Sequence, residues 1–128
     1  MRLTQLSVKR IRTDQVNKTD KECIVVAVFE PGPEHRDEVR ELLIRVTPTV
    51  HEEPGCVFYT MNEDSEGRFV HIEAWETRQH WLNHMKHESV AEILSGVEGK
   101  LTKDITVYEL YNVPTGQSGM GSIQAGNR

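Results

Sequence analysis

The sequence contains no long run of apolar residues. No stretch of about 18 such residues occurs in its 128 positions, which argues against a membrane-spanning segment. Residues 1–15 carry basic side chains but lack the continuous apolar stretch and the cleavage site of a secretion signal. We therefore expect a cytoplasmic protein that has no membrane partner.

Cysteine and positive charge are also scarce. The two cysteines, Cys23 and Cys56, form no C-x-x-C pair and are too few for a disulfide-held fold, so we predict two buried, reduced thiols. The 20 Asp and Glu residues exceed the 15 Lys and Arg residues, which gives a net charge of −5. Because nucleic-acid binding needs clustered Lys and Arg, we expect no nucleic-acid partner.

Patterned apolar residues fill the middle of the chain. The composition, 37% hydrophobic and 27% charged, is typical of a globular protein, and the length fits one domain. Residues 1–22 are polar and weakly patterned, while residues 114–128 are rich in Gly, Ser, Gln and Asn. These patterns predict an N-terminal extension (1–22), a core domain (23–113) and a flexible C-terminal tail (114–128).

Strands and helices alternate in the predicted core. Short β-branched or alternating runs predict strands at residues 23–30, 56–62, 69–76 and 105–111. Helical spacing of apolar residues predicts one helix from Glu34 to about Val50 and further helix after Thr77, a suitable N-cap. The order is β-α-β-β-α-β, which predicts a ferredoxin-like α+β fold with an antiparallel sheet covered by helices on one face.

The opposite face of this sheet is predicted to be apolar as well. In the first strand, apolar side chains occupy both faces, because Ile24, Val26 and Val28 alternate with Val25, Ala27 and Phe29. A broad apolar sheet face exposed to water is unfavourable. We therefore predict a homodimer that buries this second face.

Four segments of the core carry a resemblance to a known family. In chain order they are PGPEHRDEVRELL, EEPGCVFYTMNED, FVHIEAWET and QHWLNHMKHESV. Together, over Cys23 to Tyr111, the chain resembles the antibiotic biosynthesis monooxygenase domain, which implies a dimeric ferredoxin-like α+β barrel. The resemblance also implies a monooxygenase that needs no cofactor and oxidises a phenolic or quinol-like small molecule with dioxygen. In such a mechanism the bound phenol loses a proton, its anion gives an electron to dioxygen, and the radicals recombine in a dry pocket.

Six residues form the candidate site. Strand alternation places Phe69, His71, Glu73 and Trp75 on one face and Val57, Tyr59 and Met61 on one face of the neighbouring strand. The family pattern matches Tyr59, Glu73, Trp75 and His84. The predicted catalytic residues are His84, Tyr59 and Glu73, with His84 as general base because imidazole titrates near neutral pH. The predicted substrate-binding residues are Trp75, His71 and Phe69.

Each candidate also has a purely structural interpretation. Trp75 and Tyr59 could pack in the core, and His84 could bond a backbone carbonyl or water. For Glu73, an ion pair with Arg68 or Arg78 is the preferred interpretation.

A metal site is not expected from the histidines of the second helical region. His80, His84 and His87 are spaced so that pairs of them could share a helical face. However, the segment HWLNH lacks the glutamate of the H-E-x-x-H motif, and the spacing fixes no third ligand. A polar, solvated helix face is the favoured interpretation.

Two other functions stay open, an isomerase of a small polar metabolite and a non-catalytic binding domain, whereas haem degradation is a poor candidate. Haem-degrading relatives carry a histidine near the position of Ile93 or Leu94 and an asparagine in the first strand, and this chain has neither. Isomerases of small polar metabolites tend to carry a histidine near the position of Ser89. A non-catalytic dimeric small-molecule binding domain would show a sealed pocket without convergent polar groups.

Overall fold

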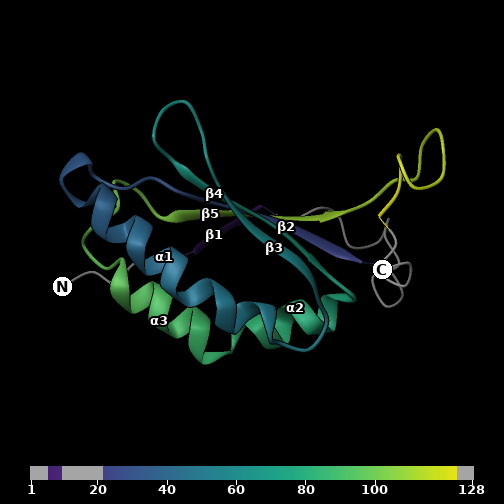
Figure 1. Ribbon diagram of the computed structural model, residues 1–128, viewed down its shortest axis with the longest axis horizontal. Coiled ribbons are helices and arrows are strands. Elements are labelled where there is room, and N and C mark those ends of the chain that lie inside the picture. Colours follow the sequence, from purple (N-terminus) through teal and green to yellow (C-terminus); the bar gives the residue numbers. More distant parts are fainter. Residues whose placement is uncertain (1–5, 10–21, 124–128) are drawn as a thin grey trace.

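A computed structural model describes residues 6–9 and 22–123, in which one five-stranded sheet is covered by helices on one face (Figure 1). The strands are β1 (Leu6–Lys9), β2 (Cys23–Phe29), β3 (Cys56–Glu63), β4 (Phe69–Trp75) and β5 (Ile105–Tyr111). The helical elements are the short 3-10 turn η2 (Pro33–His35), α1 (Arg36–His51), α2 (Arg78–Met85) and α3 (Glu88–Gly96).

The strand order is β1-β5-β2-β4-β3. The four strands β2 to β5 pair antiparallel and confirm the ferredoxin-like α+β fold. The predicted antiparallel sheet is extended by a fifth strand that was not predicted, because β1 pairs parallel to β5, with Leu6 opposite Ile105. This edge strand lies in the predicted N-terminal extension, where the segment LSVK is too short to give a clear strand pattern. Residues 1–5 and 10–21 of that extension, and residues 124–128 of the predicted tail, lie outside the described residues.

The helices and the inner sheet face enclose the hydrophobic core. One stripe of α1 is buried against the sheet, and its members are Val39, Leu42, Leu43, Val46 and Val50. α2 begins at the predicted N-cap, since the Thr77 side chain accepts a hydrogen bond from the His80 backbone N–H. Strand alternation turns one set of side chains towards these helices, so residues two apart on one strand share the core.

The register of β2 with its neighbours places two carboxylates on the inner face. Val25 of β2 lies between Glu73 of β4 and Glu109 of β5, and all three are buried. A buried carboxylate is costly unless it is paired or protonated, so Glu73 and Glu109 must each either have a partner or carry a proton.

A register shift between Cys56 and Phe58 changes the start of β3. The predicted alternation of Val57, Tyr59 and Met61 therefore holds only for Tyr59 and Met61, which lie opposite Glu73 and His71. Cys23 is buried as predicted, whereas Cys56 is only half-buried.

In the described part of the chain no helix covers the outer sheet face, and several apolar side chains of that face are accessible. Ile72, Tyr108 and Leu110 are 37–39% exposed. Beyond β5, residues 112–123 form no helix or strand and project past the end of the sheet (Figure 1). None of the helices in the described ranges combines the length and the apolar character needed to cross a membrane.

Candidate active site

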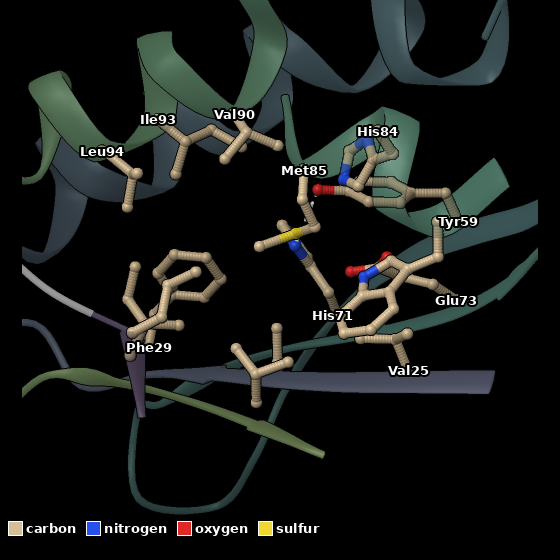
Figure 2. Close-up of a pocket in the computed structure, with 15 residues that line it drawn as sticks. Val25, Phe29, Tyr59, His71, Glu73, His84, Met85, Val90, Ile93 and Leu94 are labelled. Atoms are coloured by element: carbon tan, nitrogen blue, oxygen red, sulfur yellow. Dashed lines mark hydrogen bonds between the residues drawn. The ribbon is translucent and has the colours of Figure 1, made fainter. Parts of the chain in front are cut away.

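A cavity of about 40 Å³ lies between the inner sheet face and helices α2 and α3 (Figure 2). Most of its lining is apolar and includes Val25, Phe29, Met85, Val90 and Ile93. A cavity of this size can hold ordered water but is smaller than the roughly 150 Å³ space that takes a benzene ring. The Met85 side chain extends into the middle of the cavity (Figure 2), and its unbranched chain can change rotamer to make room.

Four of the six predicted site residues line this cavity, and they are Tyr59, His71, Glu73 and His84. Trp75 lies behind them, fully buried, where its indole N–H donates to Glu73 Oε1 at 3.0 Å and its ring stacks on His84 with centroids 4.5 Å apart. Phe69 is also fully buried but contacts the Arg36 guanidinium, 4.8 Å from its ring centroid. The sequence therefore predicted the polar residues that line the cavity. Trp75 contacts two of them without lining it, and Phe69 is not part of the lining.

His84 is held by a buried carboxylate. Its Nδ1 lies 2.8 Å from Glu53 Oε1, and the two side chains are only 4% and 5% exposed. The second carboxylate oxygen, Glu53 Oε2, accepts a hydrogen bond from Ser89 Oγ at 2.7 Å. Burial lowers the pKa of His84, and the neighbouring Glu53 opposes that effect. His84 is therefore neutral at neutral pH and can accept a proton.

Tyr59 and His71 form a second polar pair. The Tyr59 hydroxyl lies 3.0 Å from His71 Nδ1, and both side chains are buried. Burial lowers the pKa of His71 to about 3 and raises that of Tyr59 well above its usual value. Both groups are thus uncharged over the physiological range. His71 Nε2 is buried and has no hydrogen-bond partner among the described residues.

Glu73 is a buried carboxyl group that has no cationic partner among the described residues. Burial raises its pKa to about 8, and the hydrogen bond from Trp75 opposes this rise. The expected ion pair was wrong, because Arg78 Nε donates to Glu109 Oε2 at 2.7 Å and Arg68 pairs with acidic residues of the β3–β4 turn. At neutral pH Glu73 is a carboxylic acid, so it can donate a hydrogen bond but cannot serve as a base.

The three histidines of the second helical region have separate partners. His80 Nδ1 lies 2.9 Å from Thr77 Oγ1, His84 bonds Glu53, and His87 Nδ1 lies 3.2 Å from Ser89 Oγ. Within the described ranges, no group of three or more His, Cys, Asp or Glu side chains is placed to hold a metal ion.

Sequence reasoning missed three residues of this site, namely Glu53, Trp81 and Ser89. Glu53 marks the end of α1 in the sequence, where Glu-Pro-Gly is a stop signal, and it is 31 residues from His84. Trp81 lines the cavity, and its buried indole N–H has no partner among the described residues. The sequence around Glu53 does not show that its side chain is buried, and only the tertiary fold identifies its partner.

Comparison with known proteins gives one family and several similar structures. The family model for antibiotic biosynthesis monooxygenase matches residues 23–95. A crystal structure described as an antibiotic biosynthesis monooxygenase is 28% identical, with a TM-score of 0.68 over 72% of this chain and 99% of that chain. Rv0793 from Mycobacterium tuberculosis is 25% identical, with a TM-score of 0.68 over 77% of this chain and 99% of its own.

A third solved structure shares the fold at lower identity. PA3566 from Pseudomonas aeruginosa is 20% identical, with a TM-score of 0.68 over 76% of this chain and 99% of its own. Among curated proteins, none matches this chain significantly.

Proposed function

Because the chain belongs to the antibiotic biosynthesis monooxygenase family, we propose that it is a cofactor-independent monooxygenase of a phenolic or quinol-like small molecule. The observation that carries the proposal is the neutral, buried His84 on the wall of a largely apolar cavity, with Glu53 on the other side of its ring. A base within reach of a bound phenol can accept its proton, and an apolar site that excludes water protects the radical intermediates that follow.

The polar residues divide the chemistry among them. His84 accepts the phenolic proton, and the resulting anion transfers an electron to dioxygen. Recombination of the two radicals and loss of water leave a product with two fewer hydrogens and one more oxygen atom. His71 and the acidic form of Glu73 supply hydrogen bonds to oxygen atoms of the substrate as negative charge develops on it.

The cavity lining favours this function over its two rivals. Among the described residues, no Lys or Arg lines the cavity, so none of them offers a cation to a phosphorylated sugar, which disfavours an isomerase of such substrates. Four polar side chains converge on the cavity, which disfavours a binding domain filled by its own apolar side chains.

Oxygen consumption tests the proposal. Purified protein treated with a chelator should consume oxygen above the autoxidation rate with at least one member of a panel of quinols and anthrone-like phenols. Uptake equal to the blank with every compound would remove the oxygenase and favour the non-catalytic alternative. Uptake that a chelator abolishes would also contradict the cofactor-independent mechanism.

We also propose that the protein works in the cytoplasm as a homodimer that buries the outer sheet face. Ile72, Tyr108 and Leu110 on that face are each more than a third exposed, and half-buried apolar residues of β2 lie between them. A contiguous apolar surface on a sheet is typical of a protein interface. A second copy is the simplest partner, since a two-fold axis lets the same patch cover itself.

Ile72→Lys should separate the dimer. Each Lys would place a charge in an apolar interface, and we expect the dissociation constant to rise at least about 100-fold. Light scattering coupled to size exclusion measures the change. The matched control is Ile44→Lys, because Ile44 is an exposed apolar residue on α1, away from the sheet. A dimer that survives Ile72→Lys, or one that Ile44→Lys disrupts, would contradict this interface.

A further inference from the structure

We propose that Glu53 and Tyr59 are positioning residues that hold the two cavity histidines in opposite tautomers, so that the cavity selects an uncharged ligand with both a hydroxyl donor and an acceptor oxygen. His84 then presents a bare Nε2, and His71 presents an Nε2–H. This inference deepens the proposed function and depends on it only for the use of this cavity as the substrate site.

The tautomer of His84 follows from its contact with Glu53. An ionised carboxylate can only accept hydrogen bonds, so the ring nitrogen 2.8 Å from Glu53 Oε1 carries the proton. That nitrogen is Nδ1, and a neutral imidazole has a single N–H. Since Glu53 is the only hydrogen-bond partner of this ring among the described residues, the lone pair on Nε2 remains available on the cavity side.

Glu53 is itself held in place. Ser89 Oγ donates to Oε2 at 2.7 Å. Trp75 stacks on the His84 ring and prevents it from turning over freely. A buried carboxylate with these partners has little rotational freedom, so it fixes both the proton and the direction of the ring.

The tautomer of His71 follows from a count of unsatisfied groups. If the Tyr59 hydroxyl donates to Nδ1 at 3.0 Å, only one buried donor, Nε2–H, lacks a protein partner. If Nδ1–H donated instead, both the Tyr59 O–H and the bare Nε2 would lack one. Buried polar groups left without partners are unfavourable, so the first arrangement is preferred.

The two rings therefore present opposite polarity to a ligand. Figure 2 shows the His71 ring pointing into the cavity next to Met85, and the rings of Tyr59 and His84 lie with their centroids 5.9 Å apart. A hydroxyl group can donate to His84 Nε2, and a second oxygen can accept from His71 Nε2–H. Trp81 adds another buried N–H without a partner among the described residues, which again favours a ligand with acceptor oxygens. Para-substituted phenols that carry a second oxygen have this pattern.

Nitrogen NMR of the intact protein tests the tautomers without any turnover. Two-bond proton–nitrogen spectra distinguish a protonated from a bare ring nitrogen. At pH 7 we expect His84 to carry its proton on Nδ1 and His71 on Nε2. The same tautomer in both rings, or an imidazolium at either, would overturn the inference.

Variants test whether Glu53 is the cause. In Glu53→Gln the amide can offer the ring either its oxygen or its NH₂, so we expect the Nε2–H form of His84 to become populated. Glu52→Gln is the matched control, because Glu52 is the adjacent residue and is exposed. The histidine nitrogen spectrum of this variant should equal that of the native protein. A His84 tautomer that Glu53→Gln leaves unaltered would overturn the positioning role. Tyr59→Phe should shift only the His71 Nδ1 resonance, towards that of a nitrogen without a hydrogen bond.

An isosteric pair of probes tests the ligand class under anaerobic conditions. We expect 4-methoxyphenol to bind at least about tenfold more tightly than 4-methylanisole, in which a methyl group replaces the hydroxyl. Equal affinity, or no binding of 4-methoxyphenol, would overturn the ligand class. A protein with opposite tautomers and selective binding but no oxygen uptake would lose the proposed function and keep this inference.

Discussion

Replacing Glu73 with Gln should raise the free energy of unfolding at pH 9 by roughly 3 to 5 kcal/mol and change it little at pH 5. The reason is the buried position of Glu73, which raises its pKa from an ordinary 4.5 to about 8. Between pH 4.5 and about pH 8 the folded protein keeps a proton on Glu73 that the unfolded chain releases, so the stability of the native protein falls as the pH rises through this window. Gln removes this loss of stability because its amide does not ionise. Its amide oxygen can still accept the hydrogen bond from Trp75, so the stability at pH 5 changes little.

Urea unfolding at several pH values between 5 and 9 measures this effect. The difference in unfolding free energy between variant and native protein isolates the effect of Glu73 from that of other titrating groups. One of these is His71, whose lowered pKa makes the fold less stable as the pH falls below 6.5. Glu41→Gln is the matched control, since Glu41 is exposed on α1 and its replacement removes no buried charge, so this variant should lack the gain at pH 9. A Glu73→Gln variant with no gain at pH 9 would mean that the Glu73 carboxyl is ionised in the fold.

The order of helices and strands could be predicted because each element carries a local pattern. The stripe from Val39 to Val50 has helical spacing, and residues 23–29 are a β-branched run before Pro and Gly. The edge strand β1 was not predicted because, among the described residues, its partner strand is β5, nearly 100 residues away in the sequence. Pairing over such a distance leaves no periodic signal in a short polar segment.

Strand alternation was enough to predict the β3 and β4 side chains that face the cavity. His71 and Glu73 share the inner face of β4 because they are two residues apart, and Tyr59 lies directly opposite Glu73. The partners of these groups were not predictable in this way. Glu73 bonds Trp75 on its own strand, whereas Arg78 turns to Glu109, a choice that depends on the register of β5 with β2.

His84→Asn should lower the rate of oxygen uptake by about 100- to 10,000-fold, the usual contribution of a general base. The Asn amide NH₂ can replace Nδ1–H as the donor to Glu53, so the carboxylate keeps its partner. What the variant lacks is a nitrogen lone pair on the cavity side. The rate measured with the best quinol of the panel should therefore fall, while the melting temperature changes little.

His80→Asn is the matched control, because His80 lies one turn earlier on α2 and contacts Thr77 without lining the cavity. Uptake by this variant should equal that of the native protein. If raising the pH restores the rate of His84→Asn, the lost function is proton removal, since more of the phenol is then ionised before it binds. A variant that stays inactive with a fully ionised phenol would instead assign His84 to substrate positioning and would contradict its role as the base.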